Sequence, residues 1–381
     1  MNDLEIMLLN LQSNVNVSNK KLSEVILYGA GNIGRRLYKN LSDSGIDVKC
    51  FFDKNVKAIK GINIPIYHPE ISVADFKNTN IILSGLFSLN LCKEIKDYLK
   101  ELGYKNIFAL HEINFSEINC KAFYENLFDG SYKKIDILGK DLGKIKEVYS
   151  FLSDDKSKKI YLDYIKAHIT MDFTKFDEPY DIKEQYLGGD LEYNIDSSRF
   201  IDCGGFDGDT IRNFIDNGKK IEKLVVFEPQ NELCNKISQY VDLNKQNIKD
   251  AIIFPCGVHS NFAKYKFATS QEAASAAQIK DDGDDIIQCV PLDAVLKGFN
   301  ATLLKMDIEG AEVAALKGAK QIIIDNRPQL AICVYHSLSD IWEIPLLIES
   351  YVENYDFYLR SYNYMGLETV LYALPKEKRL K

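Results

Sequence analysis

The chain has 381 residues, 46% of them hydrophobic, which is enough for two domains with buried cores and argues against wholesale disorder. Its 47 basic and 55 acidic residues give a net charge of −8, which disfavours a nucleic-acid-binding protein because such proteins need a basic face. No apolar run approaches the roughly 20 residues that span a bilayer, and we expect no signal peptide. None of the eight cysteines forms a Cys-x-x-Cys pair, so we expect buried, reduced thiols in a cytoplasmic protein.

A helical pattern in residues 1–20 precedes the first strand, and a glycine-rich turn follows that strand. Gly29, Gly31 and Gly34 form a Gly-x-Gly-x-x-Gly pattern, and the next apolar run ends at Asp53. In dinucleotide-binding folds such glycines bring a helix N-terminus close to a diphosphate, and the acidic residue accepts hydrogen bonds from a ribose. These four residues predict a small Rossmann-like domain with a nucleotide site.

The domain carrying this pattern is expected to span residues 22–115, and its ligand is left open. Because Asp53 is acidic, a dinucleotide would be NAD rather than NADP, which would make the protein an NAD-linked oxidoreductase. Residues 54–115 show no pattern for hydride transfer, however. A non-catalytic domain that binds a nucleotide or nucleotide-sugar is therefore the stronger alternative, and small domains of this kind near bacterial glycan enzymes are similar at the level of the fold.

From residue 116 the sequence changes character twice. Residues 116–190 have apolar residues at helical spacing and predict a helical connector. Strand and helix patterns then alternate again in residues 191–381. We expect strands at 200–203, 223–227, 251–256, 264–268, 302–307 and 329–336, helices at 311–324 and 339–353, a turn at 270–277, and a final pair of strands at 355–361 and 369–374. The alternation predicts the α/β class with two doubly wound Rossmann-like units.

The first strand of this last region ends in a second glycine-rich turn. Asp202 closes the strand, Gly204 and Gly208 allow the backbone to approach a ligand, and Asp209 opens the next helix. Either aspartate could meet a cationic group of the ligand, and Asp209 could instead cap the helix. Glu228 ends the second strand, where an acid can accept hydrogen bonds from two ribose hydroxyls.

Three blocks of this region resemble the FkbM family of methyltransferases. They are residues 200–210, 226–229 and 304–312, and the last, Leu-Lys-Met-Asp-Ile-Glu-Gly-Ala-Glu, is the most specific. The resemblance covers about residues 185–375. It implies a class I methyltransferase sheet that ends in an antiparallel hairpin, and an O-methyltransferase that uses S-adenosylmethionine, often on a sugar hydroxyl of a surface glycan or its precursor.

The resemblance also extends the expected cofactor site beyond the turn itself. It implies that the segment with Gln185 and Tyr186 closes over S-adenosylmethionine. By position alone, Gly257 follows the third strand, where such folds hold the adenine.

Methyl transfer to a hydroxyl requires aligned reactants and a group that removes one proton. His336, at the end of the fifth strand, is the candidate base, because strand ends line the ligand site in open α/β sheets. Asp307 and Glu309, after the fourth strand, could bind a divalent metal, position the cofactor or act as base. Glu312 either faces the same site or complements the helix dipole. Metal dependence and oligomeric state are left open.

Overall fold

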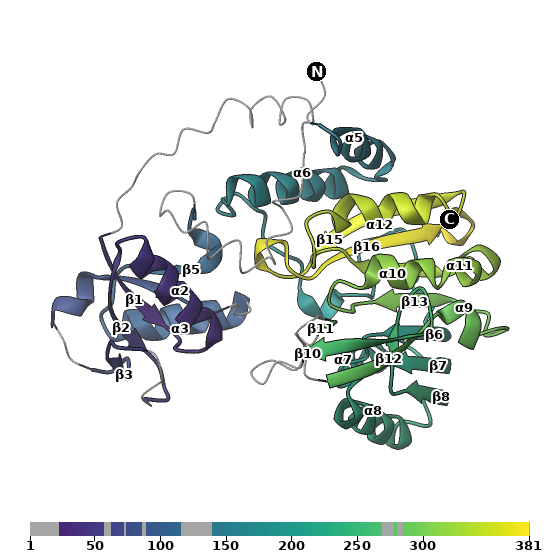
Figure 1. The fold of residues 1–381 in the computed structure, drawn as a ribbon, viewed down its shortest axis with the longest axis horizontal. Helices are drawn as coiled ribbons and strands as arrows, with labels where there is room; N and C mark the ends of the chain where they lie inside the picture. The colour runs from purple at the N-terminus through teal and green to yellow at the C-terminus, as the bar shows by residue number, and fades with distance from the viewer. Residues whose placement is uncertain are drawn as a thin grey trace. The chain divides into compact units, whose positions relative to one another are not determined.

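The computed structural model describes residues 23–56, 62–71, 74–85, 89–115, 139–268, 278–279 and 285–380. Contacts divide the chain into two units, shown in Figure 1. The smaller unit comprises Met1–Ile135, Leu162–Glu178 and Asn363–Gly366, and the larger unit comprises Asp136–Tyr161, Pro179–Tyr362 and Leu367–Lys381. The helix expected in residues 1–20 and the turn expected at 270–277 lie outside the described residues.

The smaller unit is built on a five-stranded parallel sheet with the order β3-β2-β1-β4-β5. Its strands are β1 (Glu24–Tyr28), β2 (Asp47–Phe52), β3 (Ile66–Tyr67), β4 (Asn80–Leu83) and β5 (Ile107–Ala109). Its helices are α2 (Asn32–Asp43) and α3 (Leu89–Glu101), with short 3-10 helices at Ala74–Asn78, Leu110–Glu112 and Tyr364–Gly366.

Alternate residues of β1 pack against opposite layers. Val25 and Leu27 share a core with Leu37 of α2, whereas Ile26 packs in a core with Leu99 of α3. Side chains of a strand alternate between the two faces of its sheet, so these two cores lie on opposite faces. The smaller unit is therefore doubly wound, as the sequence predicts.

The larger unit contains a seven-stranded sheet with the order β15-β16-β14-β13-β6-β7-β8. Its strands are β6 (Arg199–Cys203), β7 (Ile221–Phe227), β8 (Ile248–Phe254), β13 (Leu303–Met306), β14 (Gln329–Cys333), β15 (Tyr355–Ser361) and β16 (Thr369–Pro375). The five strands from β14 to β8 are parallel, and β16 and β15 are antiparallel to their neighbours. The expected α/β fold class and its terminal hairpin are thus confirmed.

Helices cover this larger sheet. They are α5 (Leu142–Phe151), α6 (Asp155–Thr170, which passes from the larger to the smaller unit), α7 (Asp209–Asp216), α8 (Asn231–Leu243), α9 (Leu292–Val295), α10 (Glu312–Lys317), α11 (Lys320–Asn326) and α12 (Asp340–Glu349), with 3-10 helices at Ile182–Glu184 and Lys376–Lys378. Helices α7 and α8 contribute Phe214 and Ile237 to a core that contains Phe200 and Val226 of the sheet. Helix α12 lies beside the hairpin strand β16, and α10 lies beside α12 (Figure 1).

Two expected elements differ in the structure. The expectation of one continuous helix at 311–324 is wrong, because the structure has two helices there. Helix α10 ends at Lys317, and α11 begins at Lys320. Gly318 separates them, and a Cβ there would lie 2.3 Å from the carbonyl oxygen of His259, so the chain must bend where it meets this backbone. The strand expected at 329–336 ends at Cys333.

A second, four-stranded sheet interrupts the βα alternation between β8 and β13. It has the order β11-β10-β12-β9, with β9 (Gly257–Val258), β10 (Ala263–Ala268), β11 (Gln278–Ile279) and β12 (Asp285–Val290). The sequence predicts only β10 of these strands. Strands β9 and β11 have two residues each, and β12 is followed only by the short helix α9. Among the described residues, Phe267, Ile287 and Cys289 form its small core.

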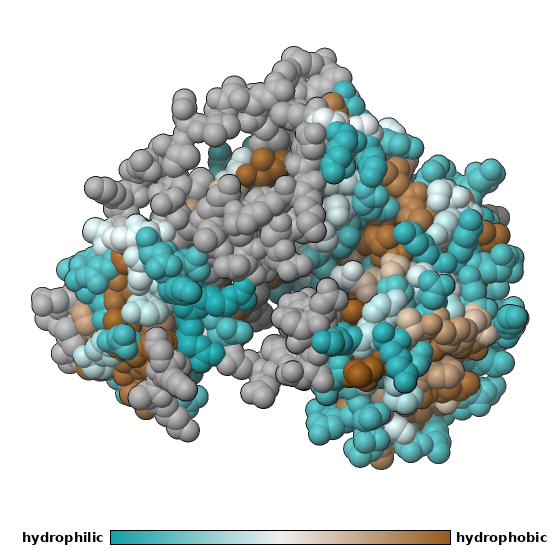
Figure 2. Space-filling view, viewed as in Figure 1, coloured by the Kyte–Doolittle hydropathy of each residue, from teal (hydrophilic) through white to brown (hydrophobic). Residues whose placement is uncertain are grey.

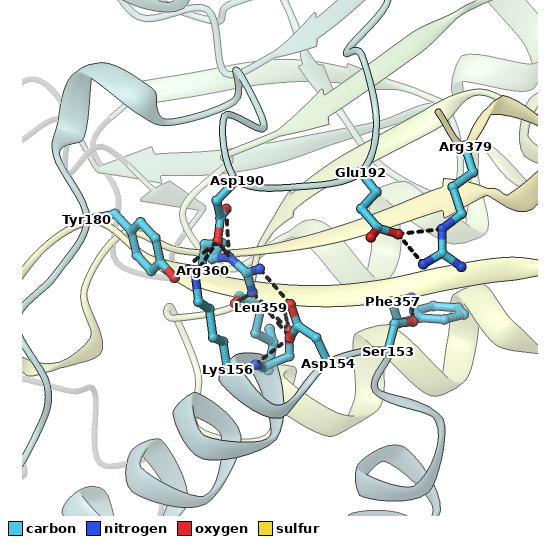
Figure 3. Close-up of polar contacts among 11 residues, drawn as sticks. Ser153, Asp154, Lys156, Tyr180, Asp190, Glu192, Phe357, Leu359, Arg360 and Arg379 are labelled. Atoms are coloured by element: carbon cyan, nitrogen blue, oxygen red, sulfur yellow. Dashed lines mark hydrogen bonds and ion pairs between the residues drawn. The ribbon is translucent and has the colours of Figure 1, made fainter. Parts of the chain in front are cut away.

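A buried arginine ties the hairpin to the helical segment within the larger unit (Figure 3). Arg360 of β15 is 1% exposed, and its Nε lies 2.9 Å from both carboxylate oxygens of Asp190. Its Nη2 donates to Asp154 at 2.6 Å, and its Nη1 donates to Ser157 at 3.1 Å. Burial opposes ionisation of Asp154 and Asp190, but Arg360 outweighs it and lowers the pKa of both.

The surface of the larger unit mixes hydrophilic and hydrophobic residues, as the face in Figure 2 shows. Leu243, Phe262 and Ile286 are among its exposed apolar residues. Within the described ranges, no helix combines the length and hydrophobicity that crossing a bilayer requires.

Candidate active site

The glycine-rich turn after β6 is held between two neighbouring strands. The backbone N–H groups of Gly204 and Gly205 both donate to the carbonyl oxygen of Phe227, at 2.9 and 3.2 Å. Gly204 has a φ of 80°, and a Cβ there would lie 1.8 Å from the carbonyl oxygen of Asp307. Only glycine fits between β7 and β13 at this point.

Glu228 lies directly after β7 and is buried beside this turn. Its Oε2 accepts a hydrogen bond from Phe206 N at 3.0 Å, and its Oε1 accepts one from Gln230 N at 2.9 Å. Burial raises its pKa to about 7. A carboxylate has about four acceptor sites, so Glu228 keeps capacity for a ligand diol.

Asp202 is fully buried and faces Lys305 of β13. Its Oδ1 lies 3.0 Å from Lys305 Nζ, which also donates to the carbonyl oxygen of Gly204 at 2.7 Å. Burial raises the pKa of Asp202 to about 6. Although burial disfavours the lysine charge, Asp202 raises the pKa of Lys305. The pair is therefore charged at neutral pH and fixes the turn from below.

Three further predicted residues lie around the turn and β9. Gly208, with a φ of 87°, occupies the N-cap position of α7, so the alternative that Asp209 caps this helix is wrong. Asp209 is exposed. Among the described residues, its Oδ1 accepts a hydrogen bond from the adjacent Thr210 N at 2.8 Å. Gly257 packs tightly, because a Cβ there would lie 2.8 Å from Cys289 Sγ.

His336 lies just beyond β14, with its side chain 7% exposed. Its Nδ1 is 3.0 Å from Glu312 Oε1, and its Nε2 is 3.4 Å from Asp307 Oδ1 and 3.6 Å from Glu309 Oε2. Burial opposes its protonation, but Glu312, and after it Asp307 and Glu309, raise the pKa of His336 to about 10. The geometry thus places the His336 ring among three carboxyl groups, which favour its protonated form.

Glu312 belongs to this site and is not a surface residue of α10. It is fully buried, and its two carboxylate oxygens accept hydrogen bonds from Ile308 N at 2.8 Å and Gly310 N at 3.0 Å. These bonds fix the carboxylate that faces His336. Of the two alternatives for Glu312, the geometry favours the one that faces the site.

Glu309 has a strained backbone and a perturbed carboxyl group. Its φ is 56°, in the left-handed region that non-glycine residues rarely adopt. Burial raises its pKa to about 8, with a further contribution from Asp307 that His336 opposes. Such strain persists only where surrounding structure holds it, and it is frequent at functional sites.

Two tyrosines and a third glutamate lie around Asp307. Tyr186 OH donates to Asp307 Oδ2 at 3.3 Å, and Tyr335 OH lies 3.3 Å from both Asp307 Oδ1 and Glu368 Oε1. Gln185 Nε2 donates to Glu368 Oε2 at 3.0 Å. Burial, followed by the charge of Asp307, raises the pKa of Glu368 to about 7.

Asp307, Glu312 and His336 also meet the distance requirement for a metal site. Each offers one ligand atom, and these atoms lie within 4.8 Å of one another. Two carboxylates and an imidazole are a donor set that several transition metals accept.

The glycine-rich turn of the smaller unit repeats the arrangement around Glu228. Gly29 N donates to Phe52 O at 2.8 Å, and Asp53 accepts from Ala30 N and Asn55 N, both at 2.8 Å. Gly34 allows α2 to approach the turn, because a Cβ there would lie 2.0 Å from the carbonyl oxygen of Gly29. Gly31, the N-cap of α2, has open space around the position of a Cβ.

Comparison with known families identifies the larger unit. Residues 202–364 match the family model described as the methyltransferase FkbM domain. This segment is a methyltransferase domain of the FkbM family. The resemblance inferred from three sequence blocks is therefore confirmed for this part of the chain.

A solved structure shares the fold of nearly the whole chain. The crystal structure of a methyltransferase FkbM from Methylobacillus flagellatus KT aligns with a TM-score of 0.64 and 19% sequence identity, over 96% of this chain and 93% of that chain. At this identity the likeness concerns the fold. A search of curated proteins finds no match.

The FkbM domain contains the glycine-rich turn, Glu228, Asp307 and His336, whereas Gln185 and Glu368 lie just outside the matched residues. The family implies S-adenosylmethionine as the methyl donor. The residues fit this cofactor, because Glu228 has acceptor capacity for a ribose diol and the turn is free of bulky side chains at Gly204 and Gly208.

Sequence reasoning missed Lys305 and Glu368. A lysine inside the apolar run of β13 was the available signal for a buried ion pair, because a charge on a buried strand needs a partner. Glu368 belongs to no motif, and only its place before β16 brings it to Asp307.

Proposed function

We propose that the FkbM domain is an O-methyltransferase that transfers a methyl group from S-adenosylmethionine to a sugar hydroxyl of a glycan or glycan precursor. The observation that carries this proposal is the position of His336 and Asp307, 3.4 Å apart, directly beyond the glycine-rich turn that Asp307 contacts. The turn would bind the cofactor, and the adjacent His336 and Asp307 can accept a proton from the acceptor. The acceptor class rests on the family resemblance.

Glu228 would hold the ribose of the cofactor, and the turn from Gly204 to Gly208 would face its amino-acid part. Lys305 and Asp202 support this turn from inside the sheet. Gln185 and Tyr186, which contact Glu368 and Asp307, would border the reacting groups. The bound cofactor supplies an electrophilic methyl group that needs no further activation.

The remaining chemical task is to align the hydroxyl and accept its proton. Glu312 holds the Nδ1 side of His336, so Nε2 faces Asp307 and the site. The positive charge of the bound cofactor would lower the pKa of His336. Nε2 would then lose its proton and act as the base. Asp307 orients this nitrogen, and Glu309 adds a third carboxyl group on the same side.

A divalent cation is a second way to neutralise these carboxylates, and it would be held by Asp307, Glu312 and His336. Such a cation would lower the pKa of the acceptor hydroxyl. Methyl transfer with or without a metal can be distinguished by treating the protein with EDTA and then adding Mg²⁺, Mn²⁺ or Zn²⁺. Activity is measured before and after each step. Loss on chelation and recovery with one metal would establish the metal-dependent reaction.

Calorimetric titration with S-adenosylhomocysteine tests the cofactor site. We expect micromolar binding by the wild type, on the order of −8 kcal/mol, and binding weakened at least tenfold in Glu228→Gln. The matched control is Glu232→Gln, an exposed acid in the first turn of α8. Absence of binding by the wild type would reject the proposed use of this cofactor site.

We propose a nucleotide-binding role, without catalysis, for the smaller unit. The supporting observation is that Asp53 accepts two backbone hydrogen bonds, one from the glycine-rich turn and one from the residue two positions later in the chain. Glu228 accepts the same pair of hydrogen bonds in the larger unit. The two turns differ in charge: α7 begins with Asp209, whereas the first turn of α2 contains no acid. A helix N-terminus without acid suits the diphosphate of a nucleotide.

Gly31→Ala tests this second site, because a methyl group there meets no atom of the protein but would obstruct a ligand against the turn. Titration with NAD, ADP and a uridine diphosphate sugar should show binding that Gly31→Ala weakens. Gly143→Ala is the control, since its Cβ is equally unobstructed. Hydride transfer with bound NAD would instead establish the oxidoreductase alternative.

The described cysteines are free and buried, which supports a reducing compartment such as the cytoplasm as the place of action.

A further inference from the structure

The strand order of the larger sheet separates Glu368 from the cofactor-binding residues. Along the edge where the parallel strands end, Glu228 follows β7, the glycine-rich turn follows β6, Asp307 follows β13 and His336 follows β14. Glu368 comes before β16, at the far side of β14. Four strand spacings separate β7 from β16, which is about 19 Å of sheet width.

Backbone pairing places Glu368 at the same edge as His336. Val334 N donates to Thr369 O at 3.0 Å, so the start of β16 lies beside the end of β14. Glu368 is therefore next to Asp307 and His336 but on the side that faces away from Glu228. A ligand that reached Asp307 from this side, with the cofactor held on the Glu228 side, would be the acceptor.

The contacts of Glu368 leave its carboxylate short of donors. Tyr335 has one hydroxyl proton, and its oxygen lies 3.3 Å from both Glu368 Oε1 and Asp307 Oδ1. The proton can serve only one of these oxygens at a time. Gln185 supplies one further donor, to Glu368 Oε2 at 3.0 Å.

The whole group has more acceptor than donor capacity. Each carboxylate offers about four acceptor sites. Among the described residues, the donors that face Asp307 and Glu368 are Tyr186 OH, Tyr335 OH, the Gln185 amide and His336 Nε2. A ligand that brings hydroxyl or ammonium donors fits this imbalance. A ligand that brings a carboxylate or phosphate would place its negative charge next to Asp307 and near Glu309 and Glu368, whose pKa values burial and Asp307 already raise.

The backbone of Glu368 is also held in an uncommon conformation. Its φ is 55°, in the left-handed region, and such a conformation costs on the order of 1 kcal/mol or more for a non-glycine residue. Its carbonyl oxygen accepts from Tyr362 N at 3.2 Å, which fixes the turn before β16. The strained turn directs the side chain to Tyr335 and Gln185.

We propose that Glu368 binds the acceptor, and that this acceptor presents a second hydrogen-bond donor, a hydroxyl or an amine, beside the hydroxyl that is methylated. The inference rests on the proposed sugar O-methyltransferase function and makes its substrate class narrower: a neutral or amino sugar, and not a uronic acid. Glu368 contributes to binding of the acceptor. Glu228 and the glycine-rich turn bind the cofactor.

The test compares wild type, Glu368→Gln and the control Glu349→Gln, an exposed acid at the end of α12. Release of S-adenosylhomocysteine is measured with the methyl glycosides of glucose, glucosamine and glucuronic acid, and S-adenosylhomocysteine affinity by calorimetry. Hydrogen bonds to a charged group contribute about 1.5–3 kcal/mol, so Glu368→Gln should lose about 10- to 150-fold in kcat/KM, mainly through KM. Its cofactor affinity should stay within about twofold of the wild type.

The outcomes distinguish a failure of the proposed role of Glu368 from a failure of the proposed methyltransferase function. Turnover that is equal in wild type and Glu368→Gln, or equal for the uronic acid and the neutral sugar, would overturn the inference and leave the proposed function standing. A tenfold loss of S-adenosylhomocysteine affinity in Glu368→Gln would overturn it by placing Glu368 in the cofactor site. A wild type that binds S-adenosylhomocysteine but methylates none of the three glycosides would reject the sugar acceptor itself.

Because a substitution here could also disturb the hairpin, folding is followed independently. Trp342, the single tryptophan of the chain, is buried in α12 of the larger unit, so its fluorescence during urea denaturation reports on this unit. An unchanged denaturation midpoint in Glu368→Gln assigns the loss in kcat/KM to recognition. A midpoint lowered together with cofactor affinity counts against the inference.

Discussion

Glu312 Oε1 lies 3.0 Å from His336 Nδ1, and both side chains are buried. The carboxylate is fixed by two backbone N–H groups, so it cannot turn away from the ring. Because Nδ1 is occupied, the Nε2 atom is the one that faces the reacting groups. Glu312 is thus a positioning residue, and His336 is the proposed catalytic residue.

The first prediction concerns the pKa of His336, which should fall in Glu312→Gln. After burial, which opposes protonation, Glu312 is the largest influence that raises this pKa to about 10, followed by Asp307 and Glu309. Glu312→Gln should therefore lower it more than Asp307→Asn, and Asp307→Asn more than Glu309→Gln. Nuclear magnetic resonance of labelled imidazoles measures it without any acceptor, and an unchanged His336 titration in Glu312→Gln would contradict the assigned pair.

The second prediction is that His336→Asn reduces kcat strongly and leaves cofactor binding intact. General base catalysis contributes about 10²- to 10⁴-fold, so a loss in this range is expected with any acceptor that the wild type methylates. S-adenosylhomocysteine affinity should change little, because Glu228 and the turn provide those contacts. His259→Asn is the matched control, since His259 lies in the segment between β9 and β10. A kcat within a few-fold of the wild type would assign the base to another group.

The third prediction separates two effects of glycine at the turn. Gly204→Ala and Gly218→Ala both place a methyl group on a residue with positive φ, 80° and 74° respectively. Such strain costs about 1–2 kcal/mol in either variant. Only Gly204→Ala also clashes, 1.8 Å from the carbonyl oxygen of Asp307, whereas the Cβ of residue 218 would meet nothing within 4 Å.

We therefore expect Gly218→Ala to be mildly destabilised with normal S-adenosylhomocysteine binding. Gly204→Ala should lose cofactor binding by more than tenfold and be more strongly destabilised, as followed by Trp342 fluorescence. Equal behaviour of the two variants would show that the contact with Asp307 is unimportant.

The sequence predicted the part of the site that depends on parallel topology. The carboxyl ends of parallel strands share one edge, so Glu228, Asp307 and His336 could be placed together from strand order alone. The pairings inside the site depend on side-chain depth. The pattern allowed Glu312 to be exposed or buried, and it did not show that Asp202 pairs with Lys305.

Glu368 shows a different limit of sequence reasoning. It lies after the matched family segment and is brought to Asp307 by the antiparallel return of β16 beside β14. The hairpin was predictable from two strand-like runs without a helix between them, but its exact register was not. That register decides which residue before β16 meets Tyr335.

The fourth prediction concerns the buried ion pair under the turn. Lys305→Met leaves the fully buried Asp202 without its cation, and breaking a buried pair in this way costs about 3–5 kcal/mol. The double variant Asp202→Asn, Lys305→Met removes both charges and should recover part of this loss. Urea denaturation followed by Trp342 fluorescence measures both. A double variant less stable than Lys305→Met would contradict the explanation.

The last prediction compares two arginines of Figure 3 that differ in burial. Arg360 is 1% exposed and pairs with Asp154 and Asp190, whereas Arg379 is half-exposed and pairs with Glu192. Arg360→Met should lower the free energy of unfolding by about 3–5 kcal/mol at pH 7, because two partly buried carboxylates lose their cation. Arg379→Met should change it little, since exposed pairs are screened by water and salt.

The pH dependence gives this comparison its sign. Arg360 lowers the pKa of Asp154 and Asp190 below the ordinary value of 3.8. A carboxyl group with a lowered pKa stabilises the fold above its unfolded pKa, and this contribution is lost as the pH falls through the folded value. The difference between wild type and Arg360→Met should therefore be largest at neutral pH and shrink below about pH 4. A difference in Trp342 unfolding that stays constant down to pH 3 would show that Arg360 stabilises the hairpin by packing and not by its charge.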